Sequence, residues 1–200
     1  MATFSQRVAT FLFINLTFLT LLNGCIALVH KRLDNVRTQI MKRLCYNKAM
    51  KLKANEEKML AFAKRLGGLL QAQDVIVLTG ELGAGKTTFV KGLALGLDIQ
   101  QMIKSPTYTI VREYEQGKLP LYHMDVYRVG DDPDSFDLDD YLFGEGVSVI
   151  EWGELLGKDL PDDYLEVQLD KYAEGFATDA QRELELIPHG QRYENLLGEL

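Results

Sequence analysis

Residues 75–90 read VIVLTGELGAGKTTFV, and they carry the strongest signal in the chain. Four apolar residues and a threonine precede Gly80, which opens the pattern Gly-x-x-x-x-Gly-Lys-Thr. The pattern and its flanks predict a buried strand, a glycine-rich loop and the start of a helix. Backbone N–H groups of such a loop turn toward a phosphate chain, and the helix N-terminus adds the positive end of its dipole. An ordinary glycine-rich turn is the alternative, but it explains neither the strand nor the helix.

Two side chains of this loop predict that a nucleoside triphosphate binds together with Mg²⁺. Lys86 is expected to reach the β- and γ-phosphates, and the Thr87 hydroxyl is expected to bind the metal ion. Glu151 ends the apolar run 147–150, where phosphate-loop proteins usually place an acid that faces Mg²⁺. The usual acid is Asp, so Glu151 is a mild departure, and a surface carboxylate after a strand stays open as its alternative.

A second acid lies in residues 123–128, HMDVYR. Because strand side chains alternate, His123, Asp125 and Tyr127 are expected on one face of a strand. We expect Asp125 to orient water or to take part in metal binding, and Arg128 to lie near phosphate or an acid. A solvated edge face is the alternative. In the loop Ser105-Pro106-Thr107, a hydroxyl could contact the γ-phosphate, although an ordinary turn explains the same residues.

The order of predicted elements gives the fold class. Hydrophobic periodicity and turn residues predict, in chain order, a helix from residue 55 to 70, a strand at 75–79, a helix ending near residue 96, a hairpin of 107–115 with 119–127, a short helix at 135–143, a strand at 147–152, a hairpin of 164–172 with 182–187 and a terminal helix at 193–200. This order predicts an α/β fold of the P-loop NTPase type. We expect a mixed sheet with a parallel centre, antiparallel hairpins, and helices on both faces.

Charge and cysteines limit the function. Residues 1–53 carry a net charge of +8 and residues 54–200 a net charge of −15, which together give the chain's −7. Nucleic-acid binding needs Lys and Arg, so we expect a partner to hold any RNA. The two cysteines, Cys25 and Cys45, both lie in the basic part. The absence of a disulfide framework favours a reducing compartment, and we expect a cytoplasmic protein.

Residues 1–49 are predicted to be an extension of a domain that spans residues 50–200. Residues 11–29 form an uncharged apolar segment, and several basic residues follow it. Three interpretations stay open: upstream sequence that the working protein lacks, a membrane anchor that would keep the domain cytoplasmic, and a soluble helical extension. We favour the first, because the globular pattern begins only after Met50, and we therefore regard membrane association as doubtful.

Four motifs of the chain resemble those of the TsaE family, which comprises small bacterial P-loop ATPases needed to make threonylcarbamoyladenosine in tRNA. They are GELGAGKTT at 80–88, SPT at 105–107, HMDVYR at 123–128 and VIEW at 149–152, in the order and spacing of that family. The resemblance covers roughly residues 52–200. Residues 1–49 have no counterpart in it.

The resemblance implies ATP and Mg²⁺ as cofactors and gives roles to the matching positions. Asp125 and Thr107 would lie at the γ-phosphate and support hydrolysis together with Lys86, while Thr87 and Glu151 would hold Mg²⁺. ATP turnover would let a complex of TsaD and TsaB modify tRNA next to the anticodon, so tRNA would be reached only through these partners. The segment that would wrap around the ATP phosphates consists of Glu81, Leu82, Gly83, Ala84, Gly85, Lys86, Thr87 and Thr88.

A small-molecule kinase with the same phosphate loop is the alternative function. Such kinases clamp phosphorylated ligands with several arginines, and the five arginines after residue 53 do not cluster in the sequence. A GTPase would carry Asn/Thr-Lys-x-Asp and Asp-x-x-Gly sequences, and the chain contains neither. The residues therefore favour an ATPase that drives a partner.

Overall fold

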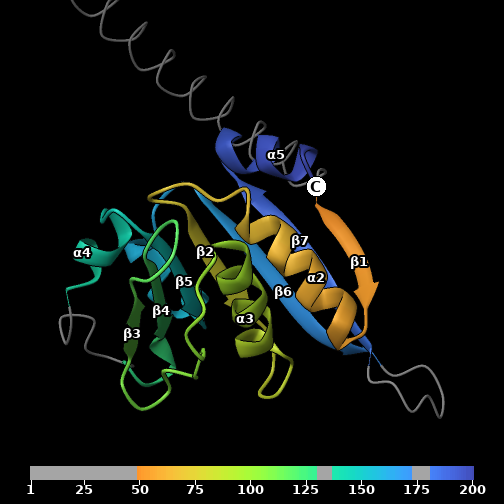
Figure 1. The fold of residues 1–200 in the computed structure, drawn as a ribbon, viewed down its shortest axis with the longest axis horizontal. Helices are drawn as coiled ribbons and strands as arrows, with labels where there is room; N and C mark the ends of the chain where they lie inside the picture. The colour runs from red at the N-terminus through yellow and green to blue at the C-terminus, as the bar shows by residue number, and fades with distance from the viewer. Residues whose placement is uncertain (1–48, 130–136, 173–180) are drawn as a thin grey trace, which may run out of the picture. The chain divides into compact units, whose positions relative to one another are not determined.

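A seven-stranded sheet forms the centre of the fold in the computed structural model, which describes residues 49–129, 137–172 and 181–200. The order of the strands across the sheet is β1-β7-β6-β2-β5-β4-β3 (Figure 1). The strands are β1 (Met50–Ala54), β2 (Val75–Thr79), β3 (Val111–Tyr114), β4 (Leu121–Asp125), β5 (Val147–Glu151), β6 (Tyr164–Tyr172) and β7 (Gln181–His189).

Parallel pairing is confined to the middle of the sheet. Strand β2 pairs in parallel with both β5 and β6, and β5 pairs in parallel with β4. The two hairpins, β3–β4 and β6–β7, are antiparallel, as is the outer pair β1–β7. The predicted mixed sheet with a parallel centre and antiparallel hairpins is therefore confirmed.

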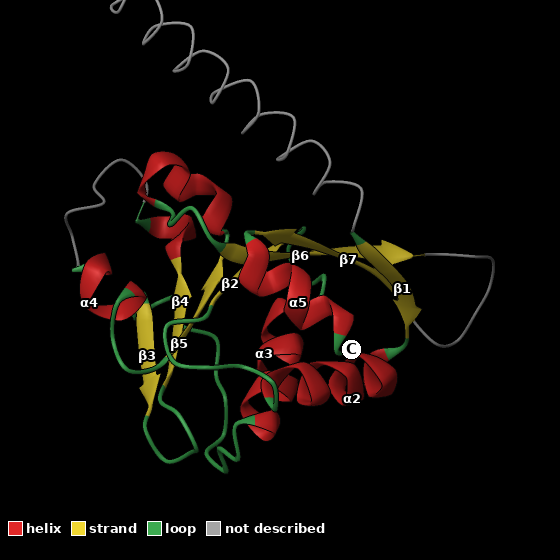
Figure 2. Ribbon diagram, turned by 90° about the horizontal axis from the view of Figure 1, so that it is seen from above, coloured by secondary structure: helices red, strands yellow, loops and turns green. Residues whose placement is uncertain are grey.

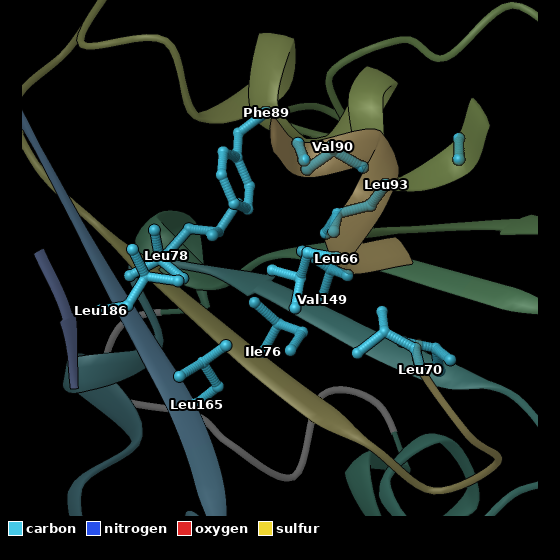
Figure 3. Close-up of a cluster of buried hydrophobic side chains, with 14 of the residues drawn as sticks. Leu66, Leu70, Ile76, Leu78, Phe89, Val90, Leu93, Val149, Leu165 and Leu186 are labelled. Carbon is cyan, nitrogen blue, oxygen red and sulfur yellow. The ribbon is translucent and has the colours of Figure 1, made fainter. Parts of the chain in front are cut away.

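Helical segments cover both faces of the sheet, as predicted (Figure 2). Because strand side chains alternate, Ile76 and Leu78 of β2 pack on one face, and Val75 and Val77 pack on the other. Figure 3 shows the first face, where Phe89 lies near Leu78. The α-helices are α2 (Glu56–Gly67), α3 (Lys86–Gly96), α4 (Leu138–Leu142) and α5 (Gln191–Gly198), and the 3₁₀ segments are η2 (Val126–Arg128) and η4 (Gly153–Asp159).

The start of α2 follows the expected capping chemistry. The Asn55 side chain accepts a hydrogen bond of 3.0 Å from the backbone N–H of Lys58, and Glu56 and Glu57 occupy the first turn. The helix buries Met59 and Leu66 in the same core cluster as β2. Local sequence therefore sets where α2 begins and which side of it is buried.

Several predicted boundaries are wrong. Only 111–114 of the expected strand 107–115 is extended, because the segment before it turns: the N–H groups of Thr109 and Ile110 both bond to the Pro106 carbonyl. Strand β1 was not predicted, since it lies at the edge of the sheet and its side chains are largely exposed or half-buried. The 3₁₀ segment η4 was not predicted either.

Two predictions fall outside the described residues. The apolar segment 11–29 and the extension 1–49 belong almost wholly to that part, so the domain boundary at residue 50 stays a prediction. Among the residues that the structure describes, no helix is long and apolar enough to cross a membrane. The short helix expected at 135–143 is present as α4, and the first two positions of the expected range are not described.

Candidate functional site

The site lies where the central parallel strands end. Strand β2 leads into Gly80 and the phosphate loop, β4 ends at Asp125, and β5 ends at Glu151. The register pairs Asp125 with Glu151, and Glu151 with Leu78 of β2. The carboxyl ends of parallel strands meet at one edge of a sheet, which is where ligands of open α/β sheets bind.

The phosphate loop needs its glycines for conformational reasons. Gly80, Gly83 and Gly85 have φ values of +130°, +75° and +113°, in the region that favours glycine. A Cβ atom on Gly80 would collide with the backbone carbonyl of Leu169 in β6. The loop therefore fits closely against the sheet, as a glycine-rich phosphate loop requires.

Lys86, at the start of α3, is buried and makes three contacts. Its Nζ donates hydrogen bonds to the carbonyls of Gly80 (2.7 Å) and Glu81 (3.2 Å) and lies 3.9 Å from the ring centroid of Trp152. Burial lowers the pKa of this ammonium group, and the nearby Glu151 and Asp125 carboxylates oppose that shift. The lysine therefore bonds to the backbone of the loop and lies close to both acids.

Glu151 joins two other side chains at the end of β5. Its Oε1 accepts hydrogen bonds from the Thr87 hydroxyl (3.0 Å) and from His123 Nε2 (2.9 Å). Mg²⁺ in proteins is bound by hard oxygen ligands, often one or two carboxylates together with substrate phosphates and water. A hydroxyl next to a carboxylate fits that chemistry. No group of three or more His, Cys, Asp or Glu side chains suited to a metal occurs in the described ranges.

Asp125 belongs to a second hydrogen-bonded series. Its Oδ2 accepts a bond of 2.7 Å from the Thr107 hydroxyl, whose oxygen lies 2.6 Å from Ser105 Oγ. Its Oδ1 accepts from the backbone N–H of Tyr127 (3.2 Å), so Asp125 also caps η2. The structure thus brings the loop Ser105–Thr107 to the hairpin acid, as the functional interpretation of both requires.

A cavity of about 440 Å³ contains most of the predicted site. Glu81, Ala84 and Thr88 belong to the same loop and helix start but lie outside its lining. The remaining predicted site residues therefore face one space. The cavity is lined by Leu82, Gly83, Gly85, Lys86, Thr87, Ser105, Thr107, Asp125, Tyr127, Arg128, Glu151 and Trp152.

One predicted placement is wrong. Tyr127 does not share a strand face with His123 and Asp125, because β4 ends at Asp125 and the chain turns into η2. Its ring lies 5.1 Å from that of Trp152 instead. Arg128 lines the cavity, and its guanidinium lies 4.8 Å from the centre of the Tyr108 ring, so its expected place near phosphate or an acid stays a prediction.

Two cations near the phosphate loop were missed by sequence reasoning. Lys171 Nζ donates to the Leu82 carbonyl (2.9 Å), and Arg182 Nε donates to the Ala84 carbonyl (2.7 Å). Lys171 and Arg182 lie opposite each other on the neighbouring strands β6 and β7. The partners are separated by 89 and 98 positions in the chain, so no local pattern could have indicated the contacts.

Known proteins of one family are similar to this chain over most of residues 50–200. Residues 53–183 match the family model described as threonylcarbamoyl adenosine biosynthesis protein TsaE. A Bacillus subtilis protein named tRNA threonylcarbamoyladenosine biosynthesis protein TsaE is 44% identical over 146 residues, which cover 73% of this chain and 89% of the relative. A protein of the same name from Treponema pallidum is 50% identical over 112 residues, covering 55% of this chain and 82% of the relative.

A solved structure has the same fold. The crystal structure of Bacillus subtilis YdiB superposes with a TM-score of 0.65 at 39% sequence identity, and the match covers 76% of this chain and 93% of that one. The shared fold confirms the P-loop NTPase-like arrangement expected from the sequence. Since the family model spans well over half of the chain and a relative at 44% identity aligns along most of its own length, this chain belongs to the TsaE family.

Proposed function

We propose that this chain hydrolyses ATP with Mg²⁺ and thereby serves the threonylcarbamoyladenosine modification of tRNA. The observation that carries the proposal is the meeting of the phosphate loop, Asp125 and Glu151 at the ends of three neighbouring parallel strands. The names of the relatives place them in threonylcarbamoyladenosine biosynthesis and supply the process. The four sequence motifs support the ATPase part of the proposal, because each motif contributes at least one residue to the lining of the same cavity.

Each residue of the site has a chemical role in this proposal. The loop amides and Lys86 bind the phosphates and offset the charge that develops on them during transfer. Thr87 and Glu151 hold Mg²⁺, and the ion neutralises phosphate charge when it is bound. Asp125 accepts a hydrogen bond from Thr107 and has a carboxylate available to orient the attacking water. The ring of Trp152 limits the movement of Lys86 through its contact with the ammonium group.

The partners are proposed from the family resemblance and from charge. The domain is strongly acidic, so direct binding of tRNA would meet electrostatic repulsion. We therefore propose that it acts through TsaD and TsaB in the cytoplasm, and that tRNA binds to that complex. Pull-down of TsaD and TsaB by the whole chain tests this assignment, and their absence from the eluate contradicts it.

A small-molecule kinase remains the competing function, and the arginines argue against it. Of the described arginines, only Arg128 lines the cavity, whereas a kinase that clamps a phosphorylated acceptor needs several. ATP turnover that depends on an added small hydroxylated acceptor, and not on water, would favour the kinase.

Two substitutions test the ATPase assignment. Lys86→Ala is expected to abolish tight ATP binding or hydrolysis, and with it modification of tRNA in a reconstituted system. Glu151→Ala is expected to weaken the Mg²⁺ dependence more than nucleotide binding, because the carboxylate acts through the metal. Normal modification by Lys86→Ala would contradict the proposed function.

A further inference from the structure

One oxygen of the Glu151 carboxylate, Oε1, accepts hydrogen bonds from two side chains. Thr87 donates its hydroxyl proton to Oε1 from the start of α3, and His123 contacts Oε1 from β4. The hydroxyl oxygen of Thr87 keeps its lone pairs for another ligand when it donates in this way. The contact with Thr87 belongs to the expected metal chemistry, whereas the contact with His123 has no role in it so far.

His123 is completely buried, and one of its ring nitrogens lacks a partner. Its relative exposure is 0%, and Nδ1 has no hydrogen-bond partner among the described residues. A carboxylate can only accept, so Nε2 must carry the proton that joins it to Glu151. The imidazole therefore directs its one donor at a single carboxylate oxygen.

An apolar side chain would fill this position at lower cost. The neighbouring positions on the same face of the sheet, Leu121 and Val149, are apolar and fully buried. A buried polar nitrogen without a partner costs about 1–3 kcal/mol. A function of the imidazole is therefore needed to explain why this cost is tolerated. Among the described residues, the His123 side chain forms a hydrogen bond only with Glu151.

We propose that His123 is a positioning residue that fixes the orientation of the Glu151 carboxylate toward Mg²⁺. The inference rests on the proposed function, because it assumes that Glu151 serves the metal. His123 contacts neither nucleotide nor ion in this role. It acts as outer-shell groups do at other metal sites, where their loss lowers metal affinity or activity about 10–100-fold.

A matched pair of substitutions separates this role from simple packing. His123→Gln keeps an N–H donor of similar reach. His123→Met introduces a side chain of nearly the same length and shape as Gln, but without the donor. Hydrolysis by the full chain is measured against MgCl₂ concentration, and binding of a fluorescent ATP analogue is measured in EDTA. Tyr122→Phe on the same strand is the control, because it removes a hydroxyl and leaves the buried core unchanged.

We expect His123→Met to raise the Mg²⁺ concentration for half-maximal hydrolysis by about 10-fold or more. Nucleotide binding in EDTA should change less than threefold, and His123→Gln and Tyr122→Phe should stay near the wild type. A Mg²⁺ dependence of His123→Met like that of the wild type overturns the inference. Equal shifts in the Gln and Met variants also overturn it, because packing alone would then explain them.

Wild-type measurements keep the two proposals apart. If the wild type neither binds nor hydrolyses ATP, the proposed function fails and the role of His123 fails with it. If His123→Met does not fold, nitrogen NMR of the wild type shows which ring nitrogen of His123 carries the proton. The signal that is missing in His123→Gln is assigned to His123. A proton on Nε2 supports the inference, and a proton on Nδ1 alone overturns it, because His123 would then donate no hydrogen bond to Glu151.

Discussion

Single residues set the charge balance of the site. Lys86 brings one cation to a space bordered by Asp125 and Glu151, and its Nζ is bonded to two backbone carbonyls of the loop that it serves. A buried ammonium group is costly unless it is hydrogen-bonded, so these carbonyls stabilise it before any phosphate arrives. In the proposed function, binding of ATP would exchange these contacts of Lys86 for phosphate contacts.

The proposed role of Asp125 in hydrolysis can be tested separately from nucleotide binding. In Asp125→Asn, Oδ1 can still accept from the Tyr127 N–H, so the cap of η2 is kept. The negative charge beside Thr107 is lost, and with it the carboxylate that we propose orients the attacking water. We expect the hydrolysis rate to fall by about 100-fold or more, while the affinity for ATP changes less than threefold.

Steady-state hydrolysis and equilibrium binding of the nucleotide check this prediction. Ser105→Ala is the control, because it removes the hydroxyl farther along the same series and leaves Asp125 bonded to Thr107. A large loss of ATP affinity in Asp125→Asn would show that the acid mainly holds the nucleotide and its metal, and would contradict a role in hydrolysis.

At the scale of elements, α2 and α3 approach each other through glycines. A Cβ atom on Gly92 of α3 would lie 2.5 Å from Ala63 Cβ and 2.9 Å from the Leu60 carbonyl oxygen of α2. Glycine in a helix interior costs about 1 kcal/mol relative to Ala, so the sequence accepts that cost to let the backbones meet. This close approach places the start of α3, with Lys86 and Thr87, on the sheet.

Gly92→Ala is therefore expected to destabilise the protein despite its better helix propensity. Overpacking at a close backbone contact costs about 1–3 kcal/mol, which exceeds the gain of about 1 kcal/mol from propensity. Because the added Cβ would lie only 2.5 Å from Ala63 Cβ, we expect a cost near the upper end of that range, and therefore a net loss of about 1–2 kcal/mol in the free energy of unfolding, measured by urea denaturation. Gly198→Ala in α5 is the control, since nothing lies within 4 Å of its added Cβ, and its stability should be unchanged or slightly higher.

The limits of sequence reasoning also show at this scale. The central strands could be predicted because β2 and β5 are buried on both faces and are mostly apolar in sequence. Strand β1 gave no such signal, because an edge strand buries little and depends on pairing with β7. The end of β4 at Asp125 could not be read from alternation, since the turn into η2 is fixed by a side chain that caps the next residues.

The candidate site shows the same division between local and distant information. Lys86 and Thr87 follow from a local motif, and Glu151 from its place after an apolar strand. The hydrogen bonds that join Glu151 to His123 and Arg182 to the phosphate loop depend on which strands are neighbours. Neighbours in the sheet are set by the tertiary fold, so the residue types were predictable while their partners were not.

For the molecule as a whole, β2 is the element to which the remaining parts are attached. It lies at the middle of the sheet, and its carboxyl end leads into the phosphate loop. At its other end, the backbone N–H of Val75 donates a hydrogen bond of 2.6 Å to the hydroxyl oxygen of Tyr193 in α5. Helix α5 is thus hydrogen-bonded to the start of the strand that leads into the phosphate loop.

A charge pair completes this attachment. Arg192 donates from Nε and Nη2 to the two carboxylate oxygens of Asp74, at 3.1 and 2.7 Å, and Nη2 also donates to the Leu69 carbonyl. Asp74 is only 4% exposed. Removing one partner of a buried pair leaves an uncompensated charge, which costs about 3–5 kcal/mol when both are buried.

Arg192→Met should therefore lower the free energy of unfolding by about 2–3 kcal/mol, less than for a fully buried pair because the Arg192 side chain is 28% exposed. Arg65→Met is the matched control: Arg65 also bonds to the C-terminal segment, through the Glu199 carbonyl, but from an exposed position. We expect it to change stability by about 0.5 kcal/mol or less. Urea denaturation compares the two, and equal losses would mean that α5 is held by its apolar contacts and not by the pair with Asp74.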